Sequence, residues 1–270
     1  MGLTSNSSGH NVLNEKFNIK LNSDIPTIAL AGNPNTGKST VFNELTGLKQ
    51  HTGNWPGKTV TRAQGFFRYQ DQKYKIIDLP GTYSLLANST EEKIARDFIC
   101  FAKPEVTVIV TDATNLERNL NLVLQIIEIT DNIIVCLNFM DEAKRKNIKI
   151  DLKGLKKDLS VPVIPTVARD NKGLDEIKEK IHQISQGNLK LKPKSIKYST
   201  EVEKAIKNIK NILSSKFPDL ENNINLRWLS LRLLEGDSSI LTTIQQYYGN
   251  NIQKSLFKQP EGEVITDGVK

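Results

Sequence analysis

The sequence is poor in the residues that build metal sites and disulfide frameworks. It contains two cysteines, Cys100 and Cys136, and three histidines at scattered positions. Both cysteines stand in apolar surroundings, which predicts buried, reduced thiols with a cytosolic, non-disulfide role. Scattered histidines exclude the ligand spacing of a zinc site. The composition is otherwise ordinary, with 38% hydrophobic and 25% charged residues, so the chain can form a packed core.

Long apolar runs are also absent. No run approaches the ~18 residues that a membrane-spanning helix requires. The first ten residues, "MGLTSNSSGH", lack the apolar core of a signal peptide. They match a myristoylation signal only loosely, because Asn6 occupies the position that requires Ser or Thr. The chain as given is therefore expected to be soluble.

Positive charge is in excess, with a net charge of +7 and lysines concentrated in residues 144–157 and 178–197. Solvated helix faces are one interpretation of these lysines. Contact with an anionic membrane surface or with RNA is the alternative.

Short apolar strands alternate with helical patterns from residue 25 to residue 186, which indicates an α/β domain with a parallel sheet covered on both faces. Strands 61–69 and 73–78 are joined only by "QDQ" and are expected to form an antiparallel hairpin. The other expected strands are 26–31, 106–111, 132–137 and 161–166. The expected helices are 38–47, 91–102, 117–130, 141–147 and 174–185.

The rest of the chain divides by composition. Residues 1–24 are polar and are expected to be a flexible lead-in, followed by the main domain over 25–186. Residues 187–198 read as a linker, and helical periods follow at 200–215, 225–235 and 237–248, which predicts a small helical domain over 199–248. Residues 249–270 are expected to form a loose tail.

The first strand ends in "GNPNTGKST", Gly32 to Thr40, which fits the phosphate-binding pattern G-x-x-x-x-G-K-[ST] in full. The glycines allow backbone N–H groups to surround the β-phosphate, and Lys38 reaches the β and γ oxygens. The Ser39 hydroxyl ligates Mg²⁺ in such loops, and the following helix directs its positive end at the phosphates. The loop joins a strand to a helix, as the motif requires.

Two later motifs favour guanine over adenine. "NFMD", Asn138 to Asp141, follows the strand 132–137, and a carboxylate there can accept from guanine N1–H and the 2-amino group. Asn138 is expected to tie this loop to the phosphate loop. The alternative for Asp141 is that it only N-caps helix 141–147. In "PTVARD" the backbone N–H of Ala168 is the candidate donor to guanine O6.

Two segments are candidates for sensing the γ-phosphate. "DLPG", residues 78–81, would hold Mg²⁺ through water at Asp78 and place the Gly81 N–H at the γ-phosphate. "HTGNWPGKTVT", residues 51–61, is rich in Gly and Pro and is hard to fold as an element. Of Thr52, Thr59 and Thr61, we expect Thr59 to close on Mg²⁺. The alternative interpretation is that Thr59 is only a residue at the edge of a strand. Trp55 also lies in this polar loop, and the alternative interpretation is that its side chain is buried in the hydrophobic core.

Together these motifs resemble a Ras-like P-loop GTPase, and their details resemble the cytosolic part of the ferrous iron transport protein B family. The stretches that carry the resemblance are "GNPNTGKSTVFNELTG", "GNWPGKTV", "DLPGTYSL", "NFMDEA" and "RWLSLRLLEGD". It covers roughly residues 27–248. It implies a mixed sheet of six strands with one antiparallel hairpin, followed by a helical domain that stabilises the GDP-bound form. The sequence departs from the family pattern at Lys58, Thr61 and Phe139.

The resemblance also implies partners and a place in the cell. Its members continue into a membrane domain that carries Fe²⁺, so the chain is expected at the cytoplasmic face of the membrane, near the inner leaflet, with no nucleic acid partner. Whether the chain forms a homo-oligomer is left open. The residues expected to contact GTP or GDP are Gly32, Asn33, Pro34, Asn35, Thr36, Gly37, Lys38, Ser39, Thr40, Gly57, Lys58, Thr59, Val60, Thr61, Asp78, Leu79, Pro80, Gly81, Asn138, Phe139, Met140, Asp141, Thr166, Val167 and Ala168.

The expected reaction is slow hydrolysis of GTP. Thr82 stands after Gly81 where many switches carry a glutamine that orients water. Backbone groups of the 51–59 loop are one substitute, and a monovalent cation is another. The resemblance implies K⁺ bound by Asn35 and by carbonyls near Gly53 and Trp55, with a structural role as the alternative for Asn35. The expected catalytic set is Lys38, Thr59, Gly81 and Asn35.

Two other functions remain as hypotheses. A soluble GTPase acting on the ribosome or tRNA is supported by the net positive charge and the motif order. Such proteins usually append an RNA-binding fold with basic and aromatic residues interleaved, whereas 200–248 has the pattern of an apolar-faced helical bundle. A nucleotide-binding interaction module without useful turnover is the third hypothesis.

Overall fold

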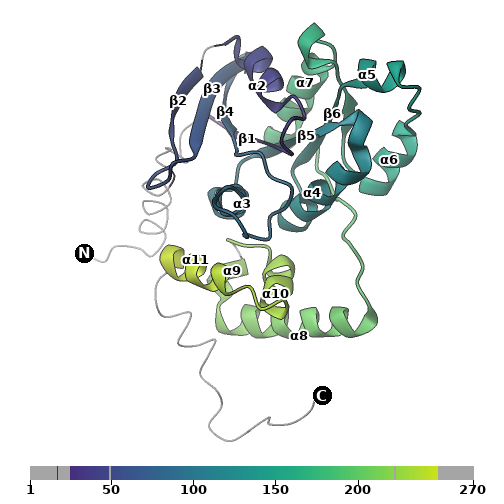
Figure 1. The fold of residues 1–270 in the computed structure, drawn as a ribbon. Coiled ribbons are helices and arrows are strands. Elements are labelled where there is room, and N and C mark those ends of the chain that lie inside the picture. Colours follow the sequence, from purple (N-terminus) through teal and green to yellow (C-terminus); the bar gives the residue numbers. More distant parts are fainter. Residues whose placement is uncertain (1–16, 18–24, 49, 222, 249–270) are drawn as a thin grey trace, which may run out of the picture.

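The computed structural model describes residues 17, 25–48, 50–221 and 223–248. Its centre is one seven-stranded sheet in the order β2-β3-β4-β1-β5-β6-β7 (Figure 1). Strands β1, β4, β5, β6 and β7 are parallel, whereas β3 runs antiparallel to both β2 and β4. The strand bounds are β1 Thr27–Gly32, β2 Gln50–Asn54, β3 Thr61–Tyr69, β4 Gln72–Asp78, β5 Val106–Asp112, β6 Ile133–Asn138 and β7 Val163–Pro165.

The seventh strand corrects the expected count of six. β2 lies inside the segment that was expected to be hard to fold as an element, and it pairs with β3 from Gln50↔Gly65 to Asn54↔Thr61. Its sequence, QHTGN, has no alternation of apolar and polar residues, and residues 51–54 are exposed. Backbone hydrogen bonds to a neighbouring strand hold this edge, so hydrophobic periodicity carried no signal for it.

Alternate residues of the central strands build two hydrophobic layers, as strand geometry requires. Ile28 and Leu30 of β1 pack with α2 (Lys38–Thr46) and α7 (Leu174–Ser185) on one face. Ala29 and Ala31 pack on the opposite face with α3 (Thr90–Asp97) and α4 (Leu116–Ile129). The parallel strands are buried on both faces, which explains their nearly continuous apolar sequences.

The remaining helices of this domain differ from the expected ones in two places. The expected helix 91–102 is α-helical to Asp97 and continues as one π-helical turn, η1 (Phe98–Ala102). Helix α6 (Leu152–Leu159) was not expected, although Leu152, Leu155 and Leu159 recur at helical spacing. Helix α5 covers Met140–Arg145, and two short 3-10 turns cover Ala113–Asn115 and Ala168–Asp170.

The helical domain packs against the α3–α4 face of the sheet domain (Figure 1). Trp228, Leu229 and Ile240 belong to the same buried cluster as Phe98 of η1 and Ile127 of α4. Its helices are α8 (Thr200–Lys216), α9 (Pro218–Glu221), α10 (Leu226–Leu234) and α11 (Ser238–Tyr248). Residues 190–199, which precede α8, carry neither helix nor strand. Across the described residues, no helix combines the length and apolar character needed to cross a membrane.

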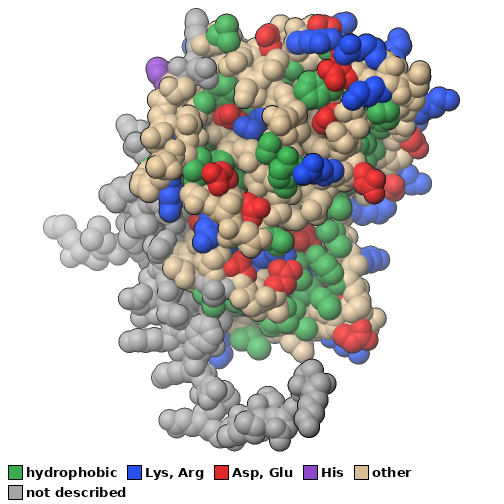
Figure 2. Space-filling view, in the orientation of Figure 1, with side chains coloured by type: hydrophobic (Ala, Val, Ile, Leu, Met, Phe, Trp, Pro, Cys, Tyr) green, Lys and Arg blue, Asp and Glu red, His purple; other side chains and the backbone are tan. Residues whose placement is uncertain are grey.

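The basic segment 144–157 forms part of one surface. Its lysines and Arg145 are exposed on and around α5 and α6, and Figure 2 shows Lys and Arg side chains gathered at the upper right, where these helices lie. The predicted lead-in and tail lie outside the described residues, except for Phe17, which is 3% exposed.

Both thiols are predicted to be unreactive in the folded protein. Burial raises the pKa of Cys100 above its usual range and raises the pKa of Cys136 to about 12, so little thiolate is present at pH 8. Ellman's reagent at pH 8 should therefore titrate no thiol in the native protein and both thiols in guanidinium chloride. Rapid stoichiometric reaction of the native protein would contradict this.

Candidate functional site

The sequence motifs meet at one edge of the sheet. β1, β4, β6 and β7 are parallel, so their carboxyl ends lie on the same side. The phosphate loop follows β1, the DLPG turn follows β4, the NFMD loop follows β6, and the Thr166–Ala168 segment follows β7. In open α/β sheets, ligands bind at this edge.

The two glycines of the phosphate loop permit close packing. A Cβ on Gly32 would lie 2.6 Å from the carbonyl oxygen of Val110 on β5. Gly37 has φ +80°, and a Cβ there would lie 2.3 Å from Nδ2 of Asn138 and 3.0 Å from the Phe139 ring. Any larger residue at either position would displace the loop from its neighbours.

Lys38 joins the phosphate loop to the DLPG turn. Its Nζ donates to the Asp78 carboxylate and, at 2.7 Å, to the carbonyl oxygen of Leu79. Burial raises the pKa of Asp78, and the charge of Lys38 opposes that rise. The structure therefore places the expected phosphate-binding cation beside the expected Mg²⁺-associated carboxylate.

Asn138 joins the phosphate loop to the base loops. It is 1% exposed. Its Nδ2 donates to the Thr36 carbonyl oxygen at 3.0 Å, and its Oδ1 accepts from the Ala168 N–H at 3.0 Å. The Thr36 hydroxyl in turn donates to the Asn33 carbonyl oxygen at 2.9 Å. The N–H expected to meet guanine O6 is thus bonded to Asn138 in this structure.

Asp141 lies in the first turn of α5, which begins at Met140. The N-cap position belongs to Phe139, at φ 64°, and no side chain caps the helix there. The alternative interpretation of Asp141 as an N-cap is therefore wrong. Its carboxylate forms an ion pair with Arg169, a residue that the motif analysis did not single out. The signal available was its position directly after Ala168 in the same loop.

The DLPG turn packs directly on the phosphate loop. The Thr82 N–H donates to the Gly32 carbonyl oxygen at 3.2 Å, and a Cβ on Gly81 would lie 3.4 Å from the Pro34 backbone. The Thr82 hydroxyl donates to the Ser84 carbonyl oxygen at 2.8 Å and accepts from the Ser84 N–H at 3.3 Å. Its hydrogen bonds are thus made within its own turn, and the side chain is buried.

Residues 55–60 form the tip of the β2–β3 hairpin. Ala63 pairs with Asp78, the last residue of β4, so this tip projects beyond the same edge of the sheet as the phosphate loop. The Trp55 N–H donates to the Val60 carbonyl oxygen and the Lys58 N–H donates to the Trp55 carbonyl oxygen, each at 2.9 Å. Thr59 is exposed in this turn, and no contact found among the described residues joins it to Ser39 or Asp78.

The residues expected to hold K⁺ are spread over two segments. Asn35 is exposed in the phosphate loop at φ 64°. Gly53 lies inside β2, opposite Arg62, and the Trp55 side chain is 2% exposed in the hydrophobic core. The core position that was the alternative for Trp55 is therefore the observed one for its side chain.

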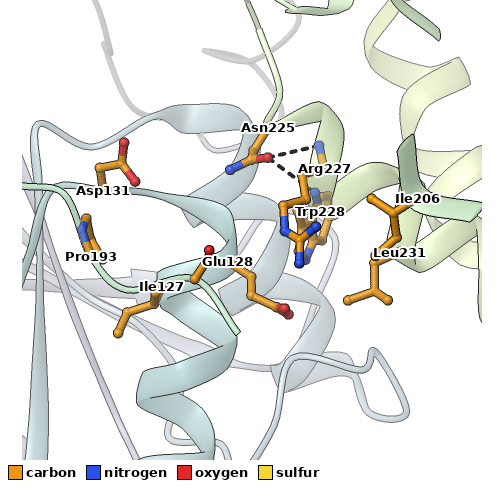
Figure 3. A pocket seen from close by; sticks show the side chains of 10 residues that line it. Ile127, Glu128, Asp131, Pro193, Ile206, Asn225, Arg227, Trp228 and Leu231 are labelled. Atoms are coloured by element: carbon orange, nitrogen blue, oxygen red, sulfur yellow. Dashed lines mark hydrogen bonds between the residues drawn. The ribbon is translucent and has the colours of Figure 1, made fainter. Parts of the chain in front are cut away.

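A separate cavity of about 70 Å³ lies between the two domains (Figure 3). The end of α4, the segment before α8 and the start of α10 line it, with Glu128, Arg227 and Trp228 among the lining side chains. The Asn225 side chain accepts from the N–H groups of Arg227 and Trp228, which caps α10. The cavity is too small for a nucleotide and lies apart from the four motif loops.

The fold and the arrangement of its loops define a P-loop G domain of the Ras-like class, followed by a helical domain. The family described as "Ferrous iron transport protein B" matches residues 26–181, and the family described as "FeoB cytosolic helical domain" matches residues 198–261. The chain belongs to the ferrous iron transport protein B family.

Similar proteins and structures agree with this assignment. The Fe(2+) transporter FeoB of Escherichia coli K12 is 39% identical over 216 residues, covering 78% of this chain and 27% of that protein. The chain thus spans about a quarter of this relative's length. The cytosolic domain of the T. maritima FeoB iron transporter in a GDP form has a TM-score of 0.75 and 38% identity, covering 83% of this chain and 85% of that one. The L. pneumophila FeoB cytosolic domain has a TM-score of 0.73 and 34% identity, covering 86% and 89%.

Asn138→Ala is predicted to destabilise the G domain. The substitution leaves the Thr36 carbonyl oxygen and the Ala168 N–H buried without their partner, which costs about 2–4 kcal/mol of unfolding free energy for two such groups. Urea unfolding followed by circular dichroism measures the change. Asn121→Ala, on the exposed face of α4, is the matched control and should change the unfolding free energy by less than about 0.5 kcal/mol. Equal effects would contradict a bridging role for Asn138.

Proposed function

We propose that this chain is the GTP-binding switch region of a bacterial ferrous iron transporter and that it hydrolyses GTP slowly. The observation that carries the proposal is the meeting of Lys38 with Asp78 and Leu79, in a chain of this family. Solved relatives from T. maritima are described in GDP and GMPPNP forms. Family membership favours this function over a ribosome- or tRNA-associated GTPase.

The phosphate site supplies the ligands that Mg²⁺ prefers. Mg²⁺ takes oxygen ligands. The Ser39 hydroxyl at the start of α2 would bind it directly, and the Asp78 carboxylate at the end of β4 would hold it through water. When GTP binds, Lys38 exchanges its contact with Asp78 for phosphate oxygens, which frees the carboxylate. Mg²⁺ bound there would neutralise charge on the β- and γ-phosphates. Thr59 joins this set by movement of the hairpin tip, and the Gly81 N–H meets the γ-phosphate.

Guanine is the proposed base. The Asp141 carboxylate accepts from N1–H and the 2-amino group after exchanging its ion pair with Arg169, which is solvent-exposed. Phe139, whose ring lies against Gly37, supplies an apolar surface beside the base. Adenine has no matching pair of donors and would leave the carboxylate unpaired.

Asp141→Asn is predicted to change the preferred base from guanine to xanthine. Xanthine carries a carbonyl oxygen at position 2, and the amide N–H of an asparagine can donate to it. Guanine carries an amino group there, so two donors would face each other. Fluorescence titration with mant-GDP and mant-XDP should show GDP affinity falling at least about 100-fold while XDP affinity rises. Asp158→Asn, on the exposed end of α6, is the control. Unchanged GDP affinity in Asp141→Asn would show that Asp141 does not contact the base.

Hydrolysis is proposed to depend on a monovalent cation. No side chain of the DLPG turn takes the place of a glutamine, because the Thr82 hydroxyl bonds within its own turn. The Asn35 amide oxygen and the backbone carbonyls near Gly53 and Trp55 are the oxygen donors that K⁺ requires, and the exposed Asn35 side chain is free to turn toward it. K⁺ would supply positive charge beside the β–γ bridging oxygen.

K⁺ is predicted to accelerate GTP hydrolysis over Na⁺, and Asn35→Asp is predicted to change that preference. Phosphate release measured in 0.2 M KCl and 0.2 M NaCl should differ by about 10-fold or more in the wild type, which corresponds to ~1.4 kcal/mol of barrier. The Asn35→Asp ratio should move away from the wild-type value. Equal rates in both salts, with Asn35→Asp unchanged in both, would contradict the proposal.

The transport role belongs to a longer protein. The E. coli relative named an Fe(2+) transporter is matched over 27% of its length, so iron transport by a membrane domain joined to this chain is part of the proposal. The exposed lysines of residues 144–157 support a position close to the anionic inner leaflet. Assembly with further copies of the chain is compatible with this arrangement.

A further inference from the structure

An aromatic cluster outside the nucleotide loops includes a residue that precedes the G domain. Phe17 packs edge-to-face on Trp55, with ring centroids 6.1 Å apart, and on Phe98, with centroids 5.3 Å apart. Trp55 and Phe98 pack edge-to-face on each other at 5.6 Å. Phe17 lies outside the family match, which begins at residue 26. Phe17, which precedes the matched residues, therefore joins a cluster built from η1 and the β2–β3 hairpin, called the switch hairpin below because its tip carries Thr59.

Arg62 contacts both the backbone of Phe17 and the ring of Trp55. Its Nη1 donates to the Phe17 carbonyl oxygen at 2.5 Å, and its guanidinium lies 5.9 Å from the centre of the Trp55 ring. Arg62 is the second residue of β3, directly beyond the hairpin tip. Phe17 is thus contacted on both sides of the tip, by Trp55 at its start and by Arg62 of β3 just beyond its end.

The cluster is connected to both segments that are proposed to sense the γ-phosphate. Two backbone hydrogen bonds close the turn from Trp55 to Val60 that carries Thr59. On the other side, Phe98 follows α3, whose Glu92 accepts from the Ser84 hydroxyl and the Asn88 N–H, each at 2.8 Å. These contacts tie α3 to the segment after the DLPG turn.

The position of Trp55 is costly as well as stabilised. Its indole Nε1–H is buried and has no hydrogen-bond partner among the described residues, and a buried unpaired donor destabilises the position that it occupies. The edge-to-face contacts with Phe17 and Phe98 act in the opposite direction, because aromatic pairs stabilise beyond their area burial. Loss of the Phe17 contact would therefore weaken the hold on Trp55.

We propose that Trp55, Phe98 and Arg62 form a docking site for Phe17 of this chain, and that Phe17 bound there holds the switch hairpin away from the phosphate site. The proposal rests on the proposed function, in which Thr59 must reach Mg²⁺ and the γ-phosphate. GDP lacks the γ-phosphate and does not require that movement. Phe17 thus opposes binding of GTP more than binding of GDP, because only one of the two bound forms needs the hairpin to move.

Nucleotide affinity of Phe17→Ala in the full chain tests this proposal. Equilibrium titrations use mant-GDP and mant-GppNHp with Mg²⁺ present. Removing two ring contacts should tighten mant-GppNHp binding about 10-fold and change mant-GDP binding less than twofold. Phe17→Leu, which keeps apolar bulk without the ring, should lie between Phe17→Ala and the wild type.

Phe67→Ala is the matched control for general loss of stability. Phe67 is 5% exposed and stacks on Tyr74 in the opposite hydrophobic layer. Its substitution should lower the unfolding free energy without changing the ratio of the two affinities. The position of Trp55 is followed separately in a Trp228→Phe background, where Trp55 is the remaining tryptophan of the two. GppNHp should shift its emission to longer wavelength, and Phe17→Ala should enlarge that shift.

The outcomes separate this proposal from the proposed function. If wild type and variant both fail to bind guanine nucleotides, the proposed function fails first. If both bind and Phe17→Ala leaves the affinity ratio unchanged, or changes it as Phe67→Ala does, the docking proposal is overturned and the proposed function stands. Unfolding of both Phe17 variants at 25 °C would assign Phe17 to the core alone and would also overturn the proposal.

Discussion

The nucleotide edge of this protein depends on one buried amide. Asn138 ends β6 and bonds the phosphate loop through Thr36 and the last loop through Ala168. An amide side chain can donate and accept at once, so one residue holds two loops that are more than 100 residues apart in sequence. Gly37 makes room for it, since a Cβ there would lie 2.3 Å from Nδ2 of Asn138 and clash with it. The geometry of the site follows from this close approach.

Packing and the buried cation Arg96 help to join the second domain to the first. Arg96 of α3 is 1% exposed and donates to Asp237, directly before α11, at 3.2 Å and to Ser239, in the first turn of α11, at 2.8 Å. Asp97 also accepts from it, so the charge is paired within the core, as burial requires. The helical domain thus contacts α3, which is the first helix after the DLPG turn. The hydrophobic cluster that contains Phe98 continues into the helical domain.

The segments around the phosphate loop show where reasoning from motifs was sufficient and where it was not. The strand-loop-helix setting of Gly32–Thr40 and the antiparallel hairpin β3–β4 were predicted from patterning, because short apolar runs and short loops are local signals. Strand β2 was not, because its residues bury no apolar face and are held by backbone pairing with β3. The positions of Trp55 and Arg169 depended on partners distant in sequence, Phe98 and Asp141.

The sequence alone determined the class of protein and its family, because the phosphate loop, DLPG and NFMD each require particular residue types at a fixed spacing. It also determined that both faces of the sheet are covered, through the nearly continuous apolar sequences of its strands. Only the tertiary structure decided which side chains are already engaged: Lys38 with Asp78, the Thr82 hydroxyl within its own turn, and Trp55 with Phe17. The physical reason is that chemical type is encoded residue by residue, whereas a contact depends on where the whole chain places both partners.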